Sequence, residues 1–136
     1  MTSAPRVVAF GGGHGLSASL EALRAVTSQL TAVVTVADDG GSSGRLRDEF
    51  GALPPGDLRM ALAALTASDE WGRLWAQIYQ HRFQGSGPLA GHAVGNLVLT
   101  ALVDMLGDPV AALDTSARLR VDGVDVSVVH RDLGRE

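Results

Sequence analysis

Two residue types are missing from this chain of 136 residues, and each absence removes a class of chemistry. There is no cysteine, so the chain can form no disulfide and offers no thiolate to a metal ion. There is no lysine either, because all eleven basic residues are arginine, which excludes a P-loop lysine and a Schiff-base lysine. The formal net charge of −4 gives no basic footprint for bulk nucleic acid.

Long apolar runs are also missing. Residues 93–106 form the longest apolar stretch, but Asn96 and Asp104 interrupt it and it is too short to span a bilayer. Residues 1–5 hold no apolar segment of signal-peptide length. These features predict a cytoplasmic protein without a membrane partner.

The composition that remains favours one folded domain over residues 1–136, with 46% hydrophobic residues and a mean hydropathy of +0.16. Residues 6–10 are apolar and end in glycines, as expected for a buried parallel strand, and a helical pattern follows from Gly15. A second β-branched strand is predicted at residues 31–36, parallel to the first because crossovers are right-handed. The order indicates an α/β fold with a Rossmann-like parallel sheet flanked by helices.

The first loop predicts an anion site beside the start of a helix. Its candidate ligand-binding residues are Gly11, Gly12, Gly13, His14 and Gly15. Leu16 stands where a dinucleotide fingerprint needs glycine, so NAD is possible but not favoured. The alternative is a tight turn that needs glycine for positive φ, with His14 as an exposed turn residue.

A second group of polar residues follows the second strand, where open α/β sheets bind their ligands. Its candidate residues are Asp38, Asp39, Gly40, Gly41, Ser42, Ser43 and Arg45. We expect residues 40–45 to form a loop that holds an anion. Adjacent side chains of an extended segment point to opposite sides, so only one carboxylate is expected in the cleft, and we favour Asp39. Alternatively, both carboxylates only cap the following turn.

The segment 54–59 adds a further acid and a further arginine. Asp57 is either the N-cap of the next helix or, with Asp39, a ligand of a divalent cation such as magnesium. Arg59 lies in the first turn of that helix, where a cation is unfavourable unless an anion binds beside it.

Two more helices are predicted from residues 68 and 91, and a last one runs to about residue 118. The apolar stripe of the first, typical of core or of a subunit contact, consists of Trp71, Leu74, Trp75, Ile78, Tyr79 and Phe83. His92 and Asn96 share one face of the next helix and are either satisfied in the core or face the ligand, which we favour. An alternating pattern at Val124, Val126 and Val128 suggests a third strand, and residues 131–136 are expected to fray.

Four of these segments together resemble one family. Residues 11–16, 35–45, 54–59 and 91–97 occur in the order of the YvcK, or gluconeogenesis factor, branch of the CofD-like superfamily. The resemblance covers about residues 6–113, and a single motif would not be specific. It implies a Rossmann-like fold and a pocket for a nucleotide or a UDP-sugar, with Asp39 and Asp57 facing a metal.

The two branches of this superfamily imply different functions. The YvcK branch is associated with UDP-sugar binding, cell shape and cell-wall synthesis during gluconeogenic growth, without an established reaction. The CofD branch transfers a phospholactyl group onto a deazaflavin in coenzyme F420 synthesis, using a divalent metal. The sequence favours a UDP-sugar-binding regulator without turnover, with the transferase as the alternative.

The resemblance weakens near the carboxyl end. The segment 115–136 departs from the family pattern, and family members are longer, so we expect this chain to lack the C-terminal part of the fold. An incomplete fold leaves apolar surface uncovered, which predicts a homo-oligomer.

Overall fold

The computed structural model describes residues 3–66, 68–118 and 128–129, and its first elements form a β-α-β unit. Strand β1 is Val7–Gly11, helix α1 is Gly13–Leu23 and strand β2 is Leu30–Val34. The two strands are parallel, with Val7 opposite Leu30 and Gly11 opposite Val34. The prediction of a parallel sheet flanked by helices is confirmed, although β2 ends at Val34 and not at residue 36.

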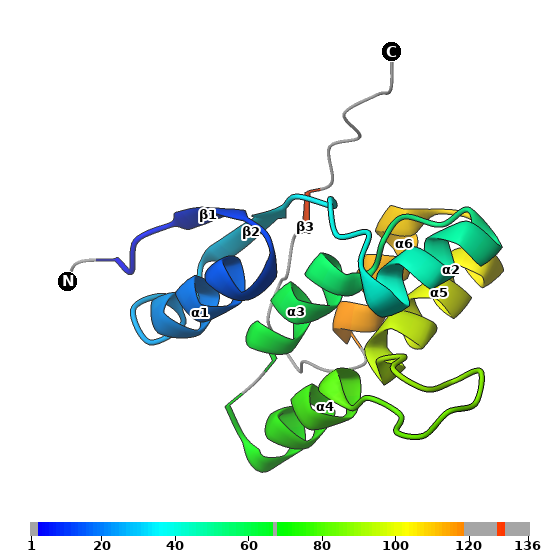
Figure 1. The fold of residues 1–136 in the computed structure, drawn as a ribbon. Helices are drawn as coiled ribbons and strands as arrows, with labels where there is room; N and C mark the ends of the chain where they lie inside the picture. Colours follow the sequence, from blue (N-terminus) through cyan, green and yellow to red (C-terminus); the bar gives the residue numbers. More distant parts are fainter. Residues whose placement is uncertain (1–2, 67, 119–127, 130–136) are drawn as a thin grey trace.

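The rest of the described chain is helical. It consists of α2 (Gly41–Phe50), α3 (Gly56–Ala64), α4 (Glu70–Gln80), α5 (Val94–Leu106) and α6 (Pro109–Arg118). Figure 1 shows α1 and α3 on the same side of the sheet, with α2, α5 and α6 grouped beyond β2. No helix of the described part is long and apolar enough to cross a bilayer.

A short third strand completes the sheet. Strand β3, Val128–Val129, pairs in parallel with Ala32 and Val33 of β2, which gives the order β1-β2-β3. The prediction of a third strand is confirmed there, whereas its other positions, Val124 and Val126, lie outside the described residues. The predicted fraying of residues 131–136 falls outside them too.

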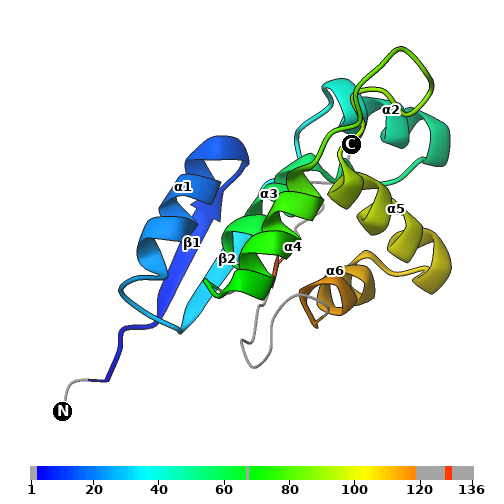
Figure 2. The same ribbon diagram turned by 90° about the horizontal axis from the view of Figure 1, so that it is seen from below.

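One face of the sheet and the helices over it form the hydrophobic core. Leu30, Ala32 and Val34 alternate along β2 and are buried, and they belong to one cluster with Leu16, Leu20, Leu58 and Leu62 of α1 and α3. Figure 2 shows α1 running beside β1, and α3 packs against β2 with α4 on the far side of α3. On the other face of β1, the side chains of Val8 and Phe10 are 53% and 76% exposed.

The aromatic stripe of α4 is divided between the core and the surface. Asp69 caps this helix by accepting a hydrogen bond from the backbone N–H of Gly72 at 2.7 Å. Tyr79 is buried and bonded to the hydroxyl of Ser116 at 2.8 Å, whereas Trp71 and Leu74 are exposed. The stripe therefore contributes to the core at its carboxyl end only.

Candidate functional site

The loops after β1 and β2 meet the start of α3 through one carboxylate. Asp57 Oδ1 accepts a hydrogen bond from the backbone N–H of Gly13 at 2.9 Å, and Oδ2 accepts one from Ala37 at 3.4 Å. The N-cap of α3 is Pro55, so the alternative that Asp57 is the N-cap was wrong. Because α3 begins one residue before Asp57, its carboxylate is free to join the two loops.

Two glycines let these segments approach closely. A Cβ atom on Gly12 would lie 2.7 Å from Thr35 Oγ1, and one on Gly56 would lie 2.3 Å from Asp38 Oδ2 and 2.6 Å from Ser43 Oγ. All three distances are shorter than 3.0 Å, which real Cβ atoms essentially never show, so the need for glycine here is steric. At Gly13 the reason is instead the positive φ of 59°.

Asp38 and Asp39 are turned differently. Asp38 Oδ1 accepts a hydrogen bond from the backbone N–H of Gly40 at 3.1 Å, while its other carboxylate oxygen lies against Gly56. Asp39 is exposed. Asp38 is exposed as well, but its carboxylate contacts the neighbouring loops, and the expected role of Asp39 in binding stays a prediction.

Residues 40–45 do not form a loop, and that prediction was wrong. Gly40 is the N-cap of α2, and the helix already includes Gly41, which has a φ of 47°. Small polar residues are poor in helix interiors but suit a first turn, and here their side chains are used by neighbouring segments. Ser43 Oγ accepts a hydrogen bond from the backbone N–H of Gly56 at 3.0 Å, which ties α2 to the start of α3.

The first turns of α1, α2 and α3 therefore converge on the same region. Their N-caps are Gly12, Gly40 and Pro55, none of which makes a side-chain capping bond. Helix α4, whose start lies elsewhere, does have such a cap. Asp57, Ser43 and Asp38 accept hydrogen bonds from the N–H groups of Gly13, Gly56 and Gly40. The other first-turn N–H groups and the helix dipoles make this edge of the sheet favourable for an anion.

Arg45 is used by another part of the chain. Its Nη1 donates to the backbone carbonyl of Ala90 at 2.9 Å and its Nη2 donates to that of Pro88 at 3.0 Å. The side chain thus holds the segment between α4 and α5 against α2. Both hydrogen bonds would have to break before this guanidinium could turn to a ligand.

Arg59 is the cation that the site leaves without hydrogen bonds. Its side chain is only 4% exposed, and its Nε and Nη1 atoms are enclosed without a hydrogen-bond partner. Burial lowers the pKa of this guanidinium, as does the charge of Arg82, whereas Asp38 and Asp57 raise it. A buried cation with open donors is the arrangement that a bound anion would complete.

His92 and Asn96 meet at a serine that the two of them share. Ser42 Oγ lies 2.8 Å from His92 Nδ1 and accepts a hydrogen bond from Asn96 Nδ2 at 3.1 Å. All three side chains are buried. The prediction that both residues lie on one helix was wrong, because α5 begins at Val94 and His92 precedes it.

The same network carries an unmatched acceptor and a perturbed histidine. Asn96 is 1% exposed and its Oδ1 has no hydrogen-bond partner. The pKa of His92 is lowered by burial and by the charges of Arg45 and Arg82, against the opposing effect of Glu49. His92 is therefore neutral at pH 7 and can accept the Ser42 proton at Nδ1.

Gly95 brings this network close to Arg59. The sequence analysis did not predict this contact. A Cβ on Gly95 would lie 2.7 Å from Arg59 Cγ and 2.6 Å from Tyr79 Cδ1, so α5 passes directly over both side chains. A lone glycine within an apolar helical pattern was the available signal. The packing partner could not be read from the pattern.

The remaining predicted residues are placed without a defined contact. His14 is exposed in the first turn of α1, and a Cβ on Gly15 would meet nothing within 4 Å. Within the described ranges no three His, Cys, Asp or Glu residues are grouped so as to hold a metal ion. A cation bound by Asp39 and Asp57 would need phosphate or water oxygens for the rest of its coordination.

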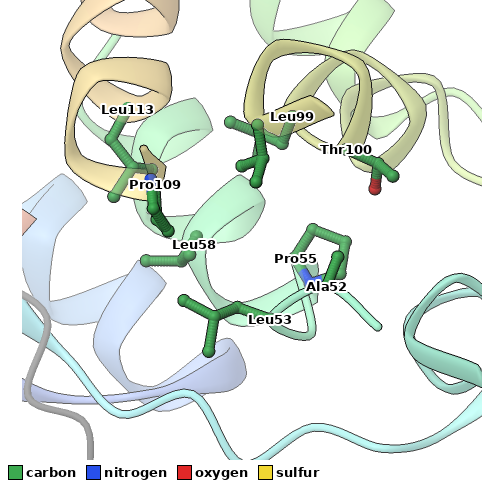
Figure 3. Close-up of a pocket in the computed structure, with 9 residues that line it drawn as sticks. Ala52, Leu53, Pro55, Leu58, Leu99, Thr100, Pro109 and Leu113 are labelled. Atoms are coloured by element: carbon green, nitrogen blue, oxygen red, sulfur yellow. The ribbon is translucent and has the colours of Figure 1, made fainter. Parts of the chain in front are cut away.

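A separate apolar cavity of about 20 Å³ lies between the 52–55 segment and helices α3, α5 and α6 (Figure 3). Leu53, Leu58, Leu99 and Leu113 point into it, together with Pro55 and Pro109. It has room for about one water molecule but offers hardly any polar partner, so it is a packing defect and not the ligand site.

The fold and the site together define a class of protein. A parallel sheet flanked by helices, with close-packed glycines and a buried arginine at its carboxyl edge, is a Rossmann-like domain. The model of the family "2-phospho-L-lactate transferase CofD" matches residues 7–129. The chain belongs to this CofD family.

Known relatives agree with this assignment. The chain is 64% identical over 117 residues to a Mycobacterium leprae protein named "Putative gluconeogenesis factor". The matched segment covers 86% of this chain and 33% of that protein. It is 48% identical over 108 residues to the Bacillus subtilis "Gluconeogenesis factor". That match covers 79% of this chain and 33% of the Bacillus subtilis protein. The chain thus spans about a third of the length of these curated relatives.

A solved structure supports the fold. The crystal structure of a Bacillus halodurans protein is similar with a TM-score of 0.81 and 42% sequence identity, over 93% of this chain and 40% of that one. A second crystal structure, of a Bacillus halodurans protein described as a member of the UPF0052 family, gives a TM-score of 0.76 at 39% identity. The family match extends past residue 113, beyond the motifs on which the sequence resemblance depended.

Proposed function

We propose that this chain is the phosphate-binding part of a cytoplasmic regulatory protein of the gluconeogenesis factor type, which binds a nucleotide sugar and does not turn it over. The observation that carries the proposal is the enclosed guanidinium of Arg59, with Nε and Nη1 unpartnered at the edge where three helices begin. A diphosphate supplies the acceptors that this group lacks. The association with cell shape and gluconeogenic growth comes from the YvcK resemblance.

Isothermal titration with UDP-glucose tests this proposal on the chain itself. We expect Arg59→Met to weaken binding by about 30-fold, because a hydrogen bond to a charged group contributes roughly 2 kcal/mol. Arg6→Met is the matched control, since Arg6 is exposed at the opposite end of β1 and bonds only Gln29. A folded wild-type chain that does not bind UDP-glucose would contradict the proposal.

Asp39→Ala tests the metal within the same proposal. If a divalent cation such as magnesium bridges the carboxylates and the diphosphate, binding of UDP-glucose should depend on magnesium and weaken in this variant. Asp48→Ala, an exposed acid on α2, is the control. Equal affinity with and without magnesium would contradict a role for the metal in binding, while the proposed anion site would stand.

A second candidate function is phospholactyl transfer, which the description of the matching family favours. It requires a deazaflavin acceptor and a divalent cation, and it should give product only when both are supplied. An assay with magnesium, on a full-length relative and on this chain, separates the two candidates. Absence of product from both would leave the binding function.

A further inference from the structure

The enclosed polar atoms of the site include both hydrogen-bond donors and an acceptor, and this combination limits which ligands can satisfy them. Arg59 offers enclosed donors at Nε and Nη1, whereas Asn96 offers an enclosed acceptor at Oδ1, and none of the three has a hydrogen-bond partner. Buried polar atoms in folded proteins are almost always paired. A ligand that satisfies both residues must accept hydrogen bonds at one position and donate at another.

Arg59 and Asn96 are held next to each other by packing. Gly95, which precedes Asn96, lies so close to Arg59 that a Cβ would sit 2.7 Å from Cγ. The backbone N–H of Asn96 donates to the carbonyl of Ala93 at 3.0 Å, which fixes the first turn of α5 beside α3. The backbone that carries Asn96 therefore packs against the stem of the Arg59 side chain.

The orientation of the Asn96 amide is determined by its neighbours. Its Nδ2 donates to Ser42 Oγ at 3.1 Å, and Ser42 Oγ lies 2.8 Å from His92 Nδ1. In the tautomer of neutral His92 that leaves Nδ1 unprotonated, Ser42 donates to Nδ1, and the serine oxygen keeps its lone pairs for the amide N–H. This arrangement uses the nitrogen of Asn96 and leaves its oxygen as the open atom.

Resting on the proposed function, we propose that Asn96 is a specificity-determining residue: its Oδ1 accepts a hydrogen bond from a sugar hydroxyl next to the phosphate that Arg59 binds. Ser42 and His92 position the amide and do not touch the ligand. The site then distinguishes a nucleoside diphosphate that carries a second sugar on its terminal phosphate from one that does not. A ligand analogue without this hydroxyl should bind more weakly, because it leaves the Asn96 acceptor buried and unpaired.

A pair of ligands tests this without any mutation. UDP-glucose and the β-methyl ester of UDP carry the same uridine and the same diphosphate diester charge, but only the first has the hydroxyls of a glucosyl group beside the β-phosphate. We expect the wild-type chain to bind UDP-glucose about tenfold more tightly, the factor that corresponds to one well-formed hydrogen bond. Equal affinities for the two ligands would overturn the inference while leaving the proposed function intact.

Asn96→Leu provides the second arm. This variant of similar size has no acceptor, so it should lower the affinity for UDP-glucose to that for the methyl ester and leave the methyl ester unchanged. Thr100→Val is the matched control, because Thr100 is buried one turn further along α5 and its hydroxyl donates to the Asn96 carbonyl at 2.8 Å. It should keep the preference for the sugar.

The outcomes separate the two levels of the argument. Loss of the preference in Asn96→Leu alone supports the inference, and retention of the preference overturns it. If neither ligand binds to the folded wild-type chain, the proposed function is overturned as well. Circular dichroism of each variant identifies unfolding, and in that case the ligand pair on the wild-type chain decides.

Discussion

Replacing Arg59 by methionine should make the chain more stable while it weakens anion binding. Two nitrogen atoms of this side chain, Nε and Nη1, are enclosed without partners, and leaving such a buried donor unsatisfied costs about 1–3 kcal/mol. Methionine keeps an unbranched apolar stem against Gly95 and removes these donors. The carboxylate of Asp57 is not left unpaired, because it accepts hydrogen bonds from two backbone N–H groups.

The opposing effect is the lost attraction between Arg59 and the carboxylates of Asp38 and Asp57, both of which favour its charged form. Asp38 is exposed, so water weakens its share of that attraction. We therefore expect a net rise of about 1–3 kcal/mol in the free energy of unfolding. At about 3–4 °C per kcal/mol for a domain of this size, the midpoint rises by roughly 3–12 °C.

Urea denaturation followed by tryptophan fluorescence measures this change directly. Trp71 and Trp75 both lie on α4, which packs against α3, so their emission reports the helix that carries Arg59. The control variant Arg6→Met should stay within about 0.5 kcal/mol of the wild type. A fall of 2 kcal/mol or more in Arg59→Met would refute the reasoning and would make Arg59 a structural cation of Asp38 and Asp57.

Three further predictions follow from single contacts. Gly95→Ala should destabilise the chain by about 1–3 kcal/mol in urea titration despite the better helix propensity of alanine, because the new Cβ would lie 2.9 Å from the backbone oxygen of Tyr79; an unchanged midpoint would contradict the packing. Burial and Arg45 lower the folded-state pKa of His92, so the unfolded chain takes up the proton first and stability should fall as the pH drops below about 6.5; His92→Gln should flatten that slope in acid titrations. Phe10→Lys should reduce self-association in sedimentation velocity with little effect on folding, since Phe10 is exposed on the uncovered face of β1; a wild-type chain that sediments as a monomer would remove the predicted homo-oligomer.

Local sequence patterns were sufficient for the order of the elements. The apolar runs before Gly11 and before Asp38 predicted two parallel strands, and these strands pair as β1 and β2. A helix was predicted to begin near residue 68, and the structure begins α4 at Glu70, with Asp69 as its cap. Such signals succeed because they depend on interactions between residues close in sequence.

The boundaries of the site were predicted less well. Gly and Ser at positions 40–44 indicated a loop, because their propensities are poor in helix interiors, but tertiary contacts stabilise them as the start of α2. Ser43 bonds Gly56 and Ser42 bonds Asn96, and neither partner is near in sequence. Side-chain contacts of this kind outweighed a local preference of less than 1 kcal/mol per residue.

The sequence by itself determined that this chain is an α/β domain whose glycines, acids and Arg59 gather where the strands end, because strand polarity and crossover handedness leave no other edge for those loops. Only the tertiary structure decided which of those groups are available. It placed the exposed Asp38 carboxylate against Gly56, used Arg45 to hold a backbone segment, and left Arg59 and Asn96 buried with unpaired atoms. Availability depends on what each side chain contacts across the fold, and sequence spacing does not contain that information.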